Sequence, residues 1–132
     1  MKNNLLVLSA YLPRSDARQA GHYVAYKNIS NLSKNYNVTL ISFKYKYEKI
    51  DSDLDSICKK IILIDTSVWN KLNNIIRNIH LPVHVSVKKS PTFLKKIHKE
   101  LNRTEFHNIH LEWGQMASYT EYLPSSTKIS IF

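Results

Sequence analysis

The stretch FHNIHLEWGQMASY, residues 106–119, carries the residue types best suited to chemistry. It reads as a strand that ends in His110, Glu112 and Trp113, followed by a turn at Gly114 and a helix. Alternate residues of a strand point to the same side, so His110 and Glu112 share one face. An imidazole and a carboxylate are general acid–base groups, and an indole offers an apolar platform for a sugar. The strand end is therefore a candidate reaction centre.

Each of these residues could also serve the fold alone. A hydrogen-bonded core histidine accounts for His110 equally well, and simple packing accounts for Trp113 at least as well. Glu112 fits a core poorly, because a carboxylate beside an apolar strand is costly unless it is paired or exposed in a cleft. We therefore expect an open cleft here, in which substitutions change activity more than stability. His107 lies three residues before His110 and faces the other way, so no metal-binding pair is predicted.

A second candidate site is the loop PRSDARQAGH, residues 13–22. Gly21 is predicted to open a helix, whose free N–H groups and positive dipole end suit an anion such as phosphate. Arg14, Arg18 and His22 could add positive charge. Neither a GxGxxG nor a P-loop sequence is present, and a structural turn glycine accounts for Gly21 about as well.

The elements that must position these residues alternate along the chain. Apolar, β-branched runs predict strands at residues 5–10, 37–43, 59–65, 107–112 and 127–132. Helical periodicity predicts helices at 21–36, at 67–79, from Pro91 to about Leu101, and at 114–122. Such alternation is typical of an α/β fold, a Rossmann-like parallel sheet with helices on both faces. We expect one domain over residues 1–132. Both candidate segments follow strands, where sheets of this kind bind ligands.

The net charge of +9 is concentrated in residues 88–103, which hold six Lys or Arg against Glu100 alone. The predicted basic surface consists of Lys88, Lys89, Lys95, Lys96 and Lys99. It suits phosphates of nucleotides, nucleic acid or anionic lipid, although a solvated helix face accounts for it equally well. Nucleic acid is a poor candidate, because few aromatic residues lie among these lysines and no known motif is present.

Cysteine usage and hydropathy bear on location. The single cysteine, Cys58, excludes an internal disulfide and fits a reducing compartment. The N-terminal apolar run is short and is broken by Ser9 and Tyr11, which argues against a signal peptide. No apolar run approaches the roughly 18 residues of a membrane span. We expect a cytoplasmic protein, with the basic surface available for peripheral contact with the inner membrane face.

The two candidate segments together resemble a known family. Residues 11–43, YLPRSDARQAGHYVAYKNISNLSKNYNVTLISF, resemble the opening of the N-terminal domain of retaining GT-B glycosyltransferases of the large group 1, family 4-like class. In that pattern a strand leads through a P-x(n)-GG loop to a long helix ending in L-x-x-x-x-x-V-x-L-I-S. The stretch FHNIHLEWGQMASY resembles the later D-h-h-H-h-x segment, in the variety with Glu and an aromatic residue in place of a second His.

This resemblance implies a nucleotide-sugar-dependent transferase of the hexosyl type, acting in bacterial surface polysaccharide synthesis. The N-terminal half would hold a sugar or lipid-linked acceptor, and a C-terminal half would hold the donor, which is a substrate, so no cofactor is implied. Gly21 would lie near the donor diphosphate, and His110 and Glu112 at the reaction centre. Ala20 and Gly21 stand where the family has paired glycines, and the C-terminal E-x7-E signature is missing. We therefore expect part of a longer protein, inactive alone.

The alternative is a non-catalytic Rossmann-like module that docks a protein, nucleic acid or an anionic surface through its basic face. The two hypotheses differ in the sequence expected beyond Phe132. A reading frame that continues into about 200 residues carrying E-x7-E would favour the transferase.

Overall fold

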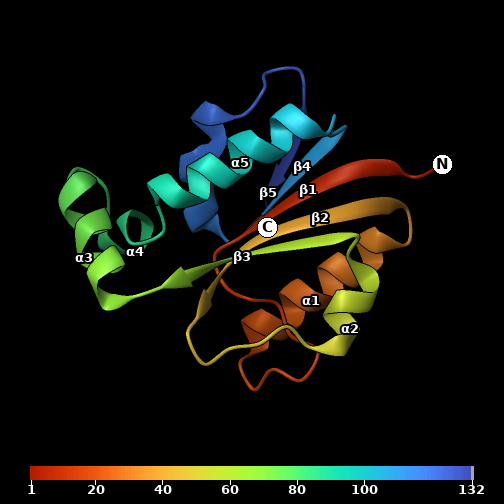
Figure 1. Cartoon of the computed structure of the whole chain (residues 1–132), viewed down its shortest axis with the longest axis horizontal. Coiled ribbons are helices and arrows are strands. Elements are labelled where there is room, and N and C mark those ends of the chain that lie inside the picture. The colour runs from red at the N-terminus through yellow and green to blue at the C-terminus, as the bar shows by residue number, and fades with distance from the viewer. Residues whose placement is uncertain (132) are drawn as a thin grey trace.

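A computed structural model describes residues 1–131, apart from the side chain of residue 68. Its five strands form one parallel sheet in the order β3–β2–β1–β4–β5 (Figure 1). The strands are β1 (Asn3–Ser9), β2 (Tyr36–Tyr45), β3 (Lys60–Thr66), β4 (Asn108–Glu112) and β5 (Lys128–Ile131). Helices flank the sheet, so the predicted Rossmann-like α/β class is confirmed.

The helices fall into three groups. One face of the sheet is covered by α1 (Ala20–Ser33) and α2 (Ser52–Ile57) (Figure 1). The opposite face is covered by α5 (Pro91–Arg103) and η1 (Gly114–Tyr122), the second of which is a 3-10 helix where an α-helix was expected. The remaining pair, α3 (Val68–Arg77) and α4 (Val83–Ser86), lies beyond the end of β3.

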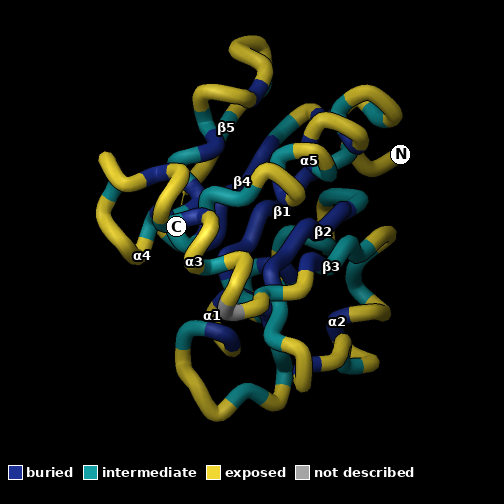
Figure 2. The backbone as a smooth tube through the Cα atoms, turned by 60° about the vertical axis from the view of Figure 1, so that its left-hand side comes forward, coloured by how far each residue is buried: buried dark blue, intermediate teal, exposed yellow. Residues whose placement is uncertain are grey.

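Two apolar layers pack the helices against the sheet, one on each face. Figure 2 shows that the central strands are the most buried part of the molecule. On the α1 side, Val7 and Leu40 pack with Ile29. On the α5 side, Leu8 and Phe93 pack in the other layer. Burial on both faces explains why the central strands read as continuous apolar runs.

Local signals fix the start of two helices. The Ser90 hydroxyl accepts a hydrogen bond from the Phe93 amide at 3.4 Å, and Pro91 occupies the first turn of α5, as predicted. The Ser67 hydroxyl accepts from the Asn70 amide at 3.1 Å and caps α3. Predicted boundaries shift slightly elsewhere, and the region 80–90 contains the short helix α4. The predicted last strand extends to residue 132, which lies outside the described residues.

Candidate functional site

The strand order reverses at β1, which pairs with β2 on one side and β4 on the other. Ser9 and Glu112 are register partners at the carboxyl ends of these strands. The loops that leave these strands, beginning at Ala10 and Trp113, therefore start side by side. This is the position at which open α/β sheets bind ligands.

Three rings gather at this position. The centroid of the Tyr11 ring lies 4.9 Å from that of Trp113, in an edge-on arrangement at 72°. The His22 ring lies 5.4 Å from Tyr11 and 6.4 Å from Trp113. The loop after β1, the start of α1 and the end of β4 thus meet in one aromatic cluster, Tyr11–His22–Trp113.

Trp113 carries two features that a packed core residue rarely shows together. Its backbone φ is 77°, a left-handed conformation that is strained for a bulky residue. Its indole Nε1 is buried without a hydrogen-bond partner among residues 1–131. Strained backbone and unsatisfied buried donors both concentrate at functional sites.

Gly21 is required by the indole of Trp113. A Cβ atom at position 21 would lie 2.0 Å from Cη2 and 2.7 Å from Cζ2 of this ring, closer than any real contact. The close approach that demands glycine is therefore that of a side chain of the same protein. Contact of Gly21 with a phosphate stays a prediction, and the structure supplies a sufficient structural reason for the residue.

His22 points one ring nitrogen inward and leaves the other available. Its Nδ1 lies 2.9 Å from the Leu12 carbonyl oxygen, and because a carbonyl only accepts, Nδ1 carries the proton. Within the described chain, Nε2 has no hydrogen-bond partner. His22 lines a hollow at the strand ends, so this nitrogen is a candidate contact for a ligand.

This hollow, of about 360 Å³, opens between the loops that leave β1 and β2, and we call it the β1–β2 hollow. Its lining includes Arg14, Arg18, His22, Tyr45, Tyr47 and Glu48. The rings of Tyr45 and Tyr47 stack with centroids 5.8 Å apart and planes 2° from parallel. The hollow therefore combines aromatic faces with cationic groups and with the carboxylates of Asp16 and Glu48.

The loop on one side of the hollow is tied down. The Ser15 amide and hydroxyl both donate to the Asp51 carboxylate, at 2.8 and 3.1 Å. The Arg14 guanidinium makes a bidentate contact with Asp16 at 2.9 and 3.1 Å, which raises the pKa of Arg14. Arg18 is exposed and has no carboxylate partner in the described part of the chain. Of the two arginines that line the hollow, Arg18 is therefore the one whose guanidinium is available to an anion.

Lys88 lies at the same edge of the sheet, against expectation. The prediction that it sits on an exposed basic surface is wrong, because only 3% of the residue is exposed. Its Nζ lies 4.3 Å from the centroid of the Tyr11 ring and 4.9 Å from that of Phe43. Burial and the nearby Lys71 lower the pKa of Lys88 to about 8. Among the described residues no carboxylate oxygen lies within 4.0 Å of this ammonium.

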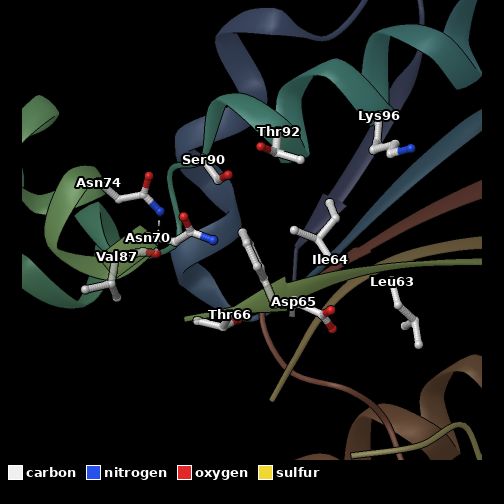
Figure 3. Close-up of a pocket in the computed structure, with 11 residues that line it drawn as sticks. Leu63, Ile64, Asp65, Thr66, Asn70, Asn74, Val87, Ser90, Thr92 and Lys96 are labelled. Atoms are coloured by element: carbon white, nitrogen blue, oxygen red, sulfur yellow. Dashed lines mark hydrogen bonds between the residues drawn. The ribbon is translucent and has the colours of Figure 1, made fainter. Parts of the chain in front are cut away.

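The other lysines of the predicted basic surface are dispersed. Lys89 pairs with Glu121 at 3.0 Å, whereas Lys95 and Lys99 are exposed on α5. Lys96 lines a separate hollow of about 200 Å³ between β3, α3 and α5, shown in Figure 3. The five lysines therefore do not share one face, since Lys88 turns into the protein.

The hollow of Figure 3 is lined by apolar side chains and by neutral polar groups. Asn70, Asn74, Ser90 and Thr92 gather around it, and Asn74 donates to the Val87 carbonyl at 3.1 Å. The Thr66 hydroxyl is buried at its edge without a hydrogen-bond partner among the described residues. Its polar character comes from side chains that cap or connect the surrounding helices.

His110 and Glu112 share one face, as predicted, but they do not lie in an open cleft. They are 2% and 4% exposed, beneath α1. Nε2 of His110 lies 2.9 Å from Oε1 of Glu112, and Asn28 of α1 donates to the same oxygen at 3.1 Å. Nδ1 of His110 lies 2.8 Å from the Ser130 hydroxyl of β5. This chain of hydrogen bonds links α1 to β4 and β5 within the fold.

The nearest hollow to this pair is separate from the β1–β2 hollow. It measures about 170 Å³, and His110 and Ser130 line it together with Asn108 and Lys128, which begin β4 and β5. The predicted site residues thus divide into two places. Gly21, Arg18, His22 and Trp113 come together at the strand ends, and His110 and Glu112 lie beneath α1.

Sequence reasoning missed Tyr11, Tyr45 and Glu48. Tyr11 follows β1 by two residues and Tyr45 ends β2, so the rule that ligands bind beyond strand ends could have found both. Glu48 is only 7% exposed and accepts from the Tyr45 amide at 2.7 Å, a turn contact that no sequence pattern marks. Lys88 was misplaced because it lies outside any helix, where periodicity gives no direction.

No cluster of three or more His, Cys, Asp or Glu side chains suited to a metal ion occurs among residues 1–131. No helix in the described part of the chain is long and apolar enough to cross a membrane. Comparisons with protein-family models, with curated proteins and with solved structures each found no match.

Proposed function

We propose that this chain is the acceptor-binding half of a nucleotide-sugar-dependent glycosyltransferase of bacterial surface polysaccharide synthesis. The observation that carries the proposal is the β1–β2 hollow, which lies at the strand ends of a Rossmann-like sheet and joins stacked tyrosines to the exposed Arg18. The proposal also rests on the resemblance of residues 11–43 and 106–119 to the GT-B N-terminal domain.

The lining suits a phosphorylated sugar. Aromatic faces pack against the apolar C–H surface of a sugar ring, as Tyr45 and Tyr47 could here. The Arg18 guanidinium can bind a phosphate through two parallel hydrogen bonds, and Nε2 of His22 offers a further polar contact. We propose an acceptor that is a sugar, free or lipid-linked, carrying phosphate. The donor would be held by a C-terminal domain with the E-x7-E signature.

The buried pair His110–Glu112 supports the site in this proposal. Glu112 accepts a hydrogen bond from Asn28 of α1, and α1 begins at Ala20, beside the hollow. The pair would thereby fix the position of His22, in the first turn of α1, relative to the strand ends. Contact of either residue with the reacting atoms stays a prediction from the resemblance.

Equilibrium binding to the chain itself tests the proposal. The panel comprises free hexoses, hexose phosphates, short-chain polyprenyl phosphosugars and nucleotide sugars. We expect binding of the phosphosugars, weakened on the order of tenfold or more in Arg18→Ala, because a hydrogen bond to a charged group contributes about 1.5–3 kcal/mol. Lys99→Ala is the matched control, since it removes one exposed positive charge from α5 and should bind as the wild type does.

Two results would contradict the proposal. Absence of binding by every phosphosugar, with the fold intact, would favour the non-catalytic docking module instead. Robust sugar transfer by this chain alone would show that it is not half of an enzyme. In the cell we propose a cytoplasmic location for the transferase, at the inner face of the membrane when the acceptor is lipid-linked.

A further inference from the structure

Ser130, an exposed residue of β5, is hydrogen-bonded to the buried pair His110–Glu112. Its hydroxyl lies 2.8 Å from Nδ1 of His110, and Nε2 of the same ring lies 2.9 Å from Oε1 of Glu112. A serine, a histidine and a carboxylate joined in this order are the groups of a Ser–His–acid triad, which is recognised by geometry and not by sequence position. We call Ser130, His110 and Glu112 the β4–β5 triad.

The pairing of two strands fixes this arrangement. His110 and Ser130 are register partners on the adjacent parallel strands β4 and β5. Glu112 follows His110 by two residues and therefore lies on the same face of β4. Val7, the partner of His110 on β1, packs in the layer on the α1 side, so the triad lies on that side of the sheet. A site built on strands holds its groups more precisely than a site built on loops.

Glu112 sets the tautomer of the imidazole. A carboxylate only accepts, so Nε2 of His110 carries the ring proton and donates it to Glu112. Nδ1 is then the acceptor nitrogen, and the Ser130 hydroxyl donates to it. The two ring nitrogens exchange roles relative to the serine proteases, but the path of the proton from serine to imidazole is the same. Asn28 donates to the same oxygen of Glu112 at 3.1 Å and orients the carboxylate.

The serine can be reached from solvent, whereas the other two members of the triad are enclosed. His110 and Glu112 are 2% and 4% exposed. Ser130 is exposed, and β5 is the last strand on its side of the described sheet. Ser130 and His110 both line the hollow of about 170 Å³. A substrate in this hollow would therefore meet the serine first, with the imidazole behind it.

The rest of the lining indicates the class of substrate. Leu5 and Leu32 supply an apolar wall, and the small volume suits a short acyl group. Asn108 and Lys128 line the same hollow, and their side-chain N–H groups can donate to a carbonyl oxygen that becomes negative. The hollow thus combines a hydroxyl, a base and hydrogen-bond donors around the space for a small carbonyl compound.

We propose that the β4–β5 triad is a hydrolytic site for short-chain carboxylic esters, with Ser130 as its nucleophile. The Ser130 oxygen attacks the ester carbonyl carbon while its proton passes to Nδ1 of His110. The bond from that carbon to the alcohol oxygen then breaks, the alcohol leaves with the proton, and the acyl group remains on Ser130. Water gives a proton to His110 and attacks the acyl carbon, which releases the carboxylic acid and returns the proton to Ser130. Glu112 stays ionised and stabilises the imidazolium. This activity does not require the transferase function.

Labelling with a fluorophosphonate tests the nucleophile. The reagent transfers its phosphonyl group to an activated serine with loss of fluoride, and peptide mapping by mass spectrometry locates the group. We expect the label on Ser130 in the folded chain and not in urea. Ser130→Ala should abolish labelling and leave Tm nearly unchanged, because the residue is exposed. Ser126→Ala removes another exposed serine, from the loop before β5, and is the matched control that should label as the wild type does.

Acylation by p-nitrophenyl acetate supplies a second readout. The folded chain should release p-nitrophenol in an initial burst and gain an acetyl group on Ser130. Glu112→Gln keeps an acceptor oxygen for His110 and Asn28 but lacks the charge that stabilises the imidazolium. It should slow acylation on the order of 100-fold with the circular dichroism unchanged. A purely structural role for Glu112 would leave the acylation rate as it is.

Three results would overturn the proposal. One is the absence of label and burst in the folded wild type. The second is equal labelling of the wild type and Ser130→Ala, which would place the reaction elsewhere. The third is an unchanged acylation rate in Glu112→Gln, because the three side chains would then not act as a triad.

Discussion

Gly21→Ala tests whether the aromatic cluster is as tightly packed as the structure shows. The substitution adds one methyl group near the start of α1. That methyl would lie 2.0 Å from Cη2 and 2.7 Å from Cζ2 of Trp113, so the indole, the helix or both must move. The indole cannot simply rotate outward, because Tyr11 and His22 pack around it.

The expected cost follows from two opposing contributions. Overpacking a close-packed site costs about 1–3 kcal/mol. Replacing glycine by alanine in a helix otherwise stabilises by about 0.5–1 kcal/mol, because it reduces the freedom of the unfolded chain. We therefore expect a net loss of roughly 1–2 kcal/mol in the free energy of unfolding, which lowers Tm by about 4–8 °C for a chain of this size.

Gly114→Ala is the matched control, because among the described residues no atom beyond the adjoining backbone and chain neighbours lies within 4 Å of a Cβ at that position. It should leave the free energy of unfolding unchanged or slightly raised. In a Trp113→Leu background the Gly21→Ala penalty should shrink, since the ring that it meets is absent, and a double-mutant cycle measures the difference. Denaturant unfolding followed by circular dichroism reports all four variants. If Gly21→Ala and Gly114→Ala prove equally stable, the close packing of Trp113 on Gly21 is wrong.

Three further predictions concern buried ionisable groups. His110→Ala should lower the free energy of unfolding by about 2–3 kcal/mol, because it removes a buried partner of Glu112, and thermal unfolding measures the loss. Burial holds the pKa of Lys88 at about 8 against an ordinary 10.5, so between these pH values the unfolded chain binds more protons. The stability of the wild type relative to Lys88→Met should therefore rise from pH 8 to 10.5, as pH-dependent urea unfolding would show. Burial raises the pKa of the Cys58 thiol to about 12, so its alkylation by iodoacetamide at neutral pH should be slow until urea unfolds the chain.

The prediction for His110 reverses the expectation from sequence, and the reason is physical. The strand pattern placed His110 and Glu112 on one face correctly, since alternation fixes the face of a strand. It could not show that α1 supplies Asn28 to the same carboxylate, because that contact joins residues far apart in the chain. A buried carboxylate with partners and an exposed one in a cleft therefore look alike in sequence.

The helices show the same limit. Periodicity identified the amphipathic stripe of α3 but not its direction, because the partner for its polar side is a backbone segment, residues 87–89. The parallel sheet was easier to predict, since continuous apolar strands alternating with helices allow few other arrangements. The sequence could not predict that Trp113 packs against Gly21. A glycine at the start of a helix can equally well mark a turn of the backbone or the approach of an anion.

Chemical-shift mapping by NMR tests most directly the central claim, that the phosphosugar binds at the strand ends and not beside His110. The chain is labelled with 15N and titrated with the phosphosugar that binds best in the panel. We predict saturable shifts at Arg18, His22 and Tyr47, which line the β1–β2 hollow. Shifts confined to Asn108 and His110, with those three signals unchanged, would place the ligand in the other hollow and contradict the account.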